Sequence, residues 1–135
     1  MYRIELSMIL GALFNSMLAY MSMHHFDEAA KIVGVILSRG FWKDPELFFR
    51  KAQIVCFDKS SSIDKLREAL QLVESECLNE TVLAGKKWEP AIKRYRALKE
   101  KIQETIRSRV EENFKIAKMI LKCAGRLIKG GKGIF

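Results

Sequence analysis

Proline and glycine, the residues that most often separate domains, are scarce in this chain. Only two prolines occur in 135 residues, and the eight glycines are scattered or gathered near the C-terminus. A linker that divides the chain into two domains is therefore not expected. With 49% hydrophobic and 30% charged residues, the composition fits one globular domain with a modest core. We expect this domain to cover residues 1–121 and a basic, partly frayed tail to cover residues 122–135.

Motifs that carry catalysis or bind metals are also missing. The chain has no glycine-rich phosphate loop, no GxSxG or HExxH motif and no cysteine–histidine pair with an orienting acid. Its three cysteines form no CxxC pair, and its two histidines are adjacent, so they would point in different directions on a helix. We therefore expect no enzyme activity, no metal site and no cofactor. The cysteines are interpreted as buried free thiols in a reducing compartment.

Acidic residues are few in the C-terminal part of the chain. Residues 1–85 carry nine Lys/Arg and eleven Asp/Glu, whereas residues 86–135 carry fifteen Lys/Arg and five Asp/Glu. This basic segment would attract anionic partners, although the solvated face of a long helix gives the same pattern. Its first part has only Trp88 and Tyr95 as aromatic residues and no groove-reading motif, so nucleic acid is not the expected partner.

Charged residues are absent between Leu6 and Phe26, and this window is nearly long enough to cross a bilayer. Asn15 and three serines lie in it, however, and hydrocarbon would leave their polar groups poorly satisfied. A secretory signal is not favoured either, because Glu5 offsets Arg3 and no small-residue cleavage site follows. We interpret the window as a helix buried between neighbouring helices in a cytoplasmic protein.

The remaining pattern is helical throughout. Helices are expected over residues 2–23, 26–38, 45–57 and 63–77, and over a long final segment from about 88 to 121 or beyond. Arg39 and Gly40 should end the second helix, while Asp44 and Pro45 should begin the third. The prediction is an all-α fold: an antiparallel helix-turn-helix array, with pairs at residues 6–39 and 44–77, closed by a long helix at residues 88–121.

A signature of the tetratricopeptide (TPR) repeat lies in the first pair. Tyr20 closes one helix, Phe26 follows the turn, and Ala29 is the small residue where the second helix would press on the first. Residues 13–20 with 26–31 resemble the middle TPR motif of chaperone-binding proteins, most closely the large immunophilins of the FKBP type. Residues 45–53 resemble the last motif of that family, and the long basic helix is similar to its C-terminal extension. The resemblance implies an adaptor that binds the acidic C-terminal peptide of a heat-shock chaperone.

In this family a carboxylate clamp holds the peptide, and its residues can be carried over by position. The middle motif supplies an Asn where Asn15 stands, and the last motif supplies an Arg where Arg50 stands. Glu46 replaces the Lys of the family pattern, which reverses the charge, and the first motif is absent. The peptide-binding candidates are Asn15, Arg50 and its neighbour Lys51. Alternatively, Asn15 bonds a neighbouring helix and Arg50 pairs with a surface acid.

Residues 114–129 have the pattern of a basic amphipathic helix. Its bulky residues Phe114, Leu121 and Leu127 are spaced as anchors for a calmodulin-like protein, and such helices also lie on anionic membranes. A helix that packs its apolar side on its own domain has the same pattern, and we favour this interpretation.

The first helix should expose an apolar strip, because the family's first motif is missing from the chain. Ile9, Leu13 and Met17 would lose their usual cover, and such a strip rarely stays exposed on a monomer. Another chain, a swapped helix or the C-terminal helix folding back would cover them. Of these, self-association is ranked first.

Overall fold

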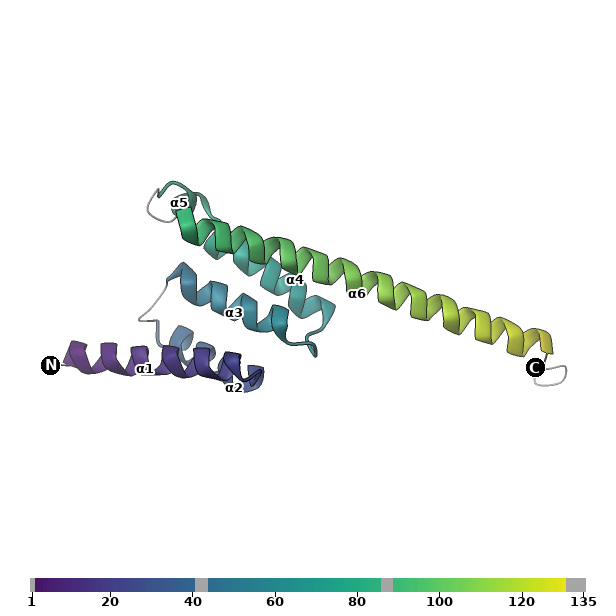
Figure 1. The fold of residues 1–135 in the computed structure, drawn as a ribbon, viewed down its shortest axis with the longest axis horizontal. Coiled ribbons are helices and arrows are strands. Elements are labelled where there is room, and N and C mark those ends of the chain that lie inside the picture. Colours follow the sequence, from purple (N-terminus) through teal and green to yellow (C-terminus); the bar gives the residue numbers. More distant parts are fainter. Residues whose placement is uncertain (1, 41–43, 86–88, 131–135) are drawn as a thin grey trace.

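The computed structural model describes residues 2–40, 44–85 and 89–130, and over these ranges it contains helices and no strand. Along the chain these are α1 (Tyr2–Ser22), α2 (Phe26–Ser38), α3 (Pro45–Phe57), α4 (Ile63–Leu72), the π-helical turn η1 (Val73–Cys77), the short α5 (Glu80–Leu83) and α6 (Glu89–Gly130). The predicted all-α class is confirmed. Figure 1 shows the shorter helices stacked together and α6 running along and past them.

Local capping residues set the helix bounds as the sequence predicted. Asp44 accepts a hydrogen bond from the Glu46 amide at 3.0 Å, and Pro45 takes the first helical position of α3. Ser62 caps α4 by accepting from the Lys65 amide at 3.2 Å. Gly40, at φ 69°, follows the end of α2, where a left-handed residue is favourable. The predicted bounds 26–38 and 45–57 are confirmed.

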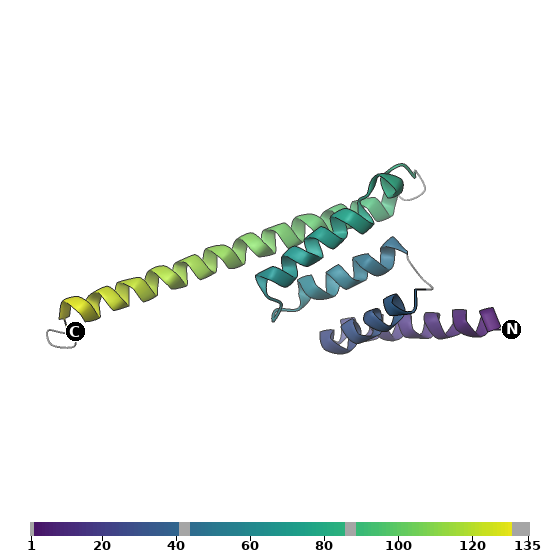
Figure 2. The ribbon, with the colours of Figure 1, turned by 180° about the vertical axis from the view of Figure 1, so that it is seen from behind.

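The helices form two stacked antiparallel pairs. Helix α2 packs against both α1 and α3, and α4 packs against both α3 and α6. Seen from behind, α2 and α4 lie in front of α1 and α6 (Figure 2). Ala29 and Ala52 are fully or almost fully buried in α2 and α3, where the repeat pattern expects small residues.

Two hydrophobic clusters hold this stack together. The first joins α1, α2 and α3 around Met17, Val33 and Ile36. The second joins α3, α4, η1 and α6 around Leu66, Tyr95 and Ile102. Burial of these side chains is the main source of stability for such a stack.

Helix α6 is longer than expected. It continues past Leu121 to Gly130, so residues 122–130, expected as part of a frayed tail, are helical. The uninterrupted apolar and basic pattern of residues 114–129 explains this continuation, because no helix-breaking residue lies before Gly130 except the single Gly125. Residues 131–135 of the expected tail, and residue 88 of the expected closing helix, lie outside the described residues.

The C-terminal helix does not fold back over α1 in the described structure. Both views show α6 on the far side of α3 from α1 (Figures 1 and 2). Of the strip expected to be exposed, Met17 is buried against α2, Leu13 is half-buried, and Ile9 is 56% exposed. None of the described helices combines the length and apolar character needed to cross a membrane.

Candidate functional site

Three side chains from α3 and α6 surround the carboxylate of Glu46. Arg94 of α6 donates from both terminal nitrogens to Glu46, at 2.8 Å and 3.3 Å, a bidentate arrangement. The Tyr95 hydroxyl donates to Glu46 Oε2 at 3.3 Å, and Arg50 Nη2 lies 3.4 Å from Oε1. We call these four residues the Glu46 cluster. It joins the first turn of α3 to the second turn of α6.

The Phe49 ring packs against three members of this cluster. The guanidinium carbons of Arg94 and Arg50 lie 4.8 Å and 5.5 Å from its centroid, and the Tyr95 ring packs against it at 5.2 Å. Glu46 and Arg50 have side chains only 23% and 22% exposed, whereas Arg94 is 46% exposed. The cluster is therefore half-buried, with Arg94 as its open side.

Burial and charge shift the protonation equilibria here. Burial lowers the pKa of Arg50, while the neighbouring Glu46 carboxylate acts in the opposite direction and Arg94 lowers it further. Burial and the Glu46 charge raise the pKa of the Tyr95 hydroxyl, which holds it neutral and able to donate. Two guanidiniums facing one carboxylate leave the cluster with one net positive charge.

The predicted peptide-binding residues do not converge on one point. Arg50 is engaged within α3, since it donates to Gln53 at 2.9 Å as well as pairing with Glu46. Asn15 is exposed on α1, and its side chain makes no hydrogen bond to the part of the chain that the structure describes. Lys51 lines a separate hollow of about 360 Å³ between α3 and α4, together with Lys65 and Glu68.

Sequence reasoning missed Arg94 and Tyr95 as partners of Glu46. They lie 48 and 49 residues away in the chain, so no local spacing connects them to it. The available signal was the charge reversal at Glu46 itself. An acid at a position where the family carries a base calls for a compensating cation, and the basic N-terminal part of the last helix supplies one.

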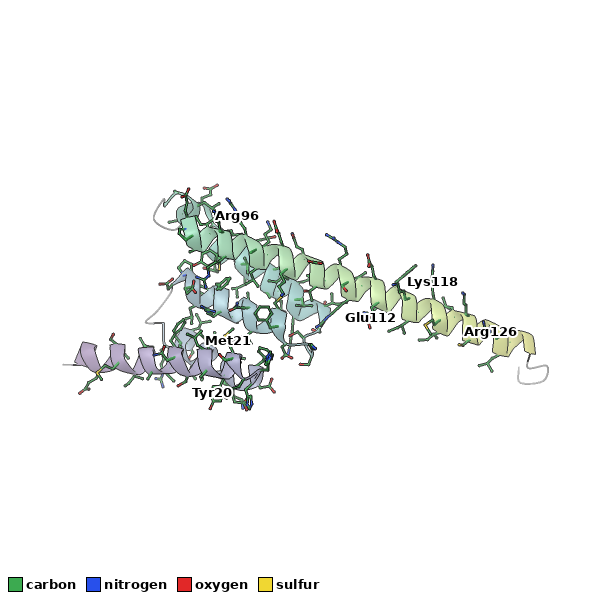
Figure 3. All side chains as sticks on the ribbon, in the orientation of Figure 1. Tyr20, Met21, Arg96, Glu112, Lys118 and Arg126 are labelled. Atoms are coloured by element: carbon green, nitrogen blue, oxygen red, sulfur yellow. The ribbon has the colours of Figure 1, made fainter. Side chains whose placement is uncertain are left out.

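The second candidate surface is the part of α6 that extends beyond the other helices, residues 110–130, which we call the arm. At its root, Arg109 Nη2 donates to the carbonyl oxygen of Lys59 at 3.0 Å. Beyond it the predicted anchors Phe114, Leu121 and Leu127 are 61%, 71% and 62% exposed. The favoured expectation that this side packs on its own domain is therefore wrong for the described structure. Figure 3 shows Glu112, Lys118 and Arg126 along the arm.

Thiols and possible metal ligands do not form a site in the described residues. Cys56 and Cys77 are buried and free as expected, whereas the expectation of a buried thiol is wrong for Cys123, which is free and exposed on the arm. No metal-binding group of three His, Cys, Asp or Glu side chains occurs in the described residues. The Cys77 thiol lies 3.4 Å from the carbonyl oxygen of Pro45, and burial raises its pKa to about 12. A thiol so protonated is a poor nucleophile.

Comparisons with protein-family models, curated proteins and solved structures find no match for this chain.

Proposed function

We propose that this chain is a TPR-like protein-interaction adaptor that binds an acidic peptide at the Glu46 cluster. By resemblance, the peptide is the acidic C-terminal tail of a heat-shock chaperone, which makes the chain a co-chaperone. The stacking of α2 between α1 and α3, and of α4 between α3 and α6, supports the scaffold part of this proposal.

The observation that carries the proposal is the binding of a carboxylate by two arginines. Arg94 and Arg50 already hold the chain's own Glu46 carboxylate, with Tyr95 as a third donor. The same donor set suits the terminal carboxylate or an acidic side chain of a peptide. The net positive charge and the half-exposed Arg94 leave the cluster attractive to a second anion.

Glu46 acts as an internal competitor in this scheme. A peptide carboxylate either adds to the open side of Arg94 or displaces Glu46 from it. Because both routes work against the Glu46 charge, binding is weaker than in a clamp that carries a Lys at this position. Asn15, exposed on α1, is not part of the Glu46 cluster, and Lys51 lies outside the site because it lines the hollow between α3 and α4.

We place this adaptor in the cytoplasm. Three free cysteines, one of them exposed, suit a reducing compartment. The acidic chaperone tail proposed as the ligand belongs to the same compartment.

The test is a titration of the full chain with a short synthetic peptide rich in Glu and Asp that ends in a free carboxylate. Arg94→Ala should weaken binding about tenfold, because it removes the exposed cation. Glu46→Gln should strengthen binding by a similar factor, because it removes the competing charge while keeping the side-chain volume. Arg50→Ala should weaken binding, and Arg67→Ala on α4 is the control for general charge loss.

Three results would reject the clamp. These are no saturable binding, equal loss with Arg67→Ala and Arg94→Ala, or weaker binding with Glu46→Gln. The same peptide with an amidated C-terminus separates recognition of the terminal carboxylate from recognition of the acidic side chains. Melting curves of each variant confirm that the fold is retained.

A further inference from the structure

The arm exposes more large apolar side chains than any other helix of the described structure. Eight of them are 45–71% exposed, and they occur in less than six turns of helix: Val110, Phe114, Ile116, Met119, Ile120, Leu121, Leu127 and Ile128. A continuous apolar surface of this kind marks an interaction site.

The apolar side of the arm is the same side of α6 that packs on the other helices. From the buried Ile102 the stripe continues through Ile106, Val110, Ala117 and Leu121 in steps of about one or two turns. The bundle, meaning α1 to α5 with residues 89–109 of α6, therefore lies on the side toward which the arm's apolar face points. A flat surface such as a bilayer would meet the bundle before it reached this face.

No other described helix lies beside the arm, so a second arm could lie along it. In Figure 1 the arm runs past the end of the bundle where the turns at residues 23–25 and 58–62 lie. Residues 110–130 extend for about 30 Å at 1.5 Å per residue. A second arm running in the opposite direction would lie against this apolar face, and its tip would reach the end of the bundle.

The charges along α6 favour this antiparallel direction. Its acids, Glu100, Glu104, Glu111 and Glu112 among them, end at residue 112, and every charged residue of the arm after that is basic. A parallel pair would place the two basic ends together. In an antiparallel pair each basic end approaches Glu111 and Glu112 of the second copy and the hollow of about 320 Å³ lined by Asp27, Glu28 and Asp58.

The basic side chains of the arm need not be buried in such a pair. Lys115, Lys122 and Arg126 lie on the side away from the apolar stripe, whereas Lys118 borders it, with its Nζ 5.0 Å from the Phe114 ring centroid. They would remain in solvent, so no unpaired charge enters the interface. The eight exposed apolar side chains of each arm would form the centre of this interface.

We propose that two copies of this chain associate through their arms, antiparallel and related by a two-fold axis. This interface is distinct from the α1 surface suggested by the sequence and is independent of peptide binding at the Glu46 cluster. The arm of each copy covers the apolar face that the bundle of the other copy leaves exposed.

Sedimentation of the full chain over a range of micromolar concentrations tests the association. The wild type should show a concentration-dependent monomer–dimer equilibrium. Leu121→Glu should raise the dissociation constant at least tenfold, since it places a charge on the apolar side. Arg126→Gln changes the net charge by the same amount on the opposite side and should sediment like the wild type. Circular dichroism of each variant checks that the arm stays helical.

Spin-label distances between identical positions of the two copies test the direction. With labels moved along the arm, the separation should be smallest near its middle and grow by about 3 Å per residue toward either end. A strictly monomeric wild type, or equal sedimentation of Leu121→Glu and wild type, overturns the proposal. A separation that is constant along the arm overturns the antiparallel arrangement. A monomer that binds anionic vesicles or an acidic calmodulin-like protein through Leu121 would assign the arm to that partner instead.

Discussion

Glu46 and Arg94 form a two-bond ion pair that ties α3 to α6, with donor–acceptor distances of 2.8 Å and 3.3 Å. The acid that stands where the resembled family carries a Lys is thus the residue that joins α6 to α3. The charge of Glu46 therefore has a structural use.

The coupling between Glu46 and Arg94 should be measurable as stability. Unfolding by urea of Glu46→Gln, Arg94→Met and the double variant should give an interaction energy of about 1 kcal/mol, because the pair is bidentate and half-buried. The exposed pair Asp64 and Arg67, at 4.0 Å, is the matched control and should give a value near zero. Equal coupling in the two pairs would contradict a structural role for the cluster.

Alkaline pH should destabilise the fold through Cys77. The folded-state pKa of its thiol is raised from 9.0 to about 12, so the stabilising contribution is complete below pH 9 and is lost as pH rises toward the folded pKa. In this window the free energy of unfolding should fall by about 1.4 kcal/mol per pH unit from this group. Tyr95, whose pKa is also raised, acts in the same direction.

Urea unfolding of the wild type and of Cys77→Ala across this pH range measures the effect. All other side chains are the same in both proteins, so the difference between the two slopes isolates the thiol. Parallel slopes would mean that the Cys77 proton is not linked to folding.

Enlarging Ala29 should be costly because it is completely buried between α1 and α2. Ala29→Leu should lower the free energy of unfolding by about 1–3 kcal/mol through overpacking. Ala30→Leu, at the next and exposed position of the same helix, should change it by less than about 0.5 kcal/mol. If both variants melt like the wild type, the helix pair is not packed as described.

Two glycines near the end of α2 should respond to alanine with opposite signs. Gly40 has φ 69°, so Gly40→Ala strains the turn and should cost about 1 kcal/mol. Gly34 lies within α2 with open space around its Cβ position, so Gly34→Ala should stabilise the helix by a similar amount. Thermal melting of the two single variants is sufficient to compare them.

Much of the fold could be predicted because short-range chemistry determines it. Asp44 followed by Pro45 favours a helix start and Gly40 favours a helix end, so the bounds of α2 and α3 could be predicted from neighbouring residues. The end of α6 was harder to place. The apolar stripe that continues beyond Leu121 also continues the helix, but it gives no sign of where the packing stops.

The Glu46 cluster could be predicted only in part, for a physical reason. Arg50 lies one turn from Glu46 on the same helix, and their pairing depends on spacing alone. Contact with Arg94 depends on how α6 crosses α3, which the packing of Phe49, Tyr95 and Leu98 decides over a long sequence separation. The exposure of Phe114 also depends on long-range packing, because Phe114 lies beyond the point where α3 and α4 end along α6.

The uninterrupted course of α6 makes it a mechanical lever. Arg94 near one end and Ile128 near the other are separated by about 50 Å of continuous helix. A tilt of about 5° at the Glu46 cluster, within the range of small helix shifts, would displace the tip of the lever by about 4 Å. Any change at the cluster that tilted α6 would therefore produce a larger displacement at the far end of the molecule.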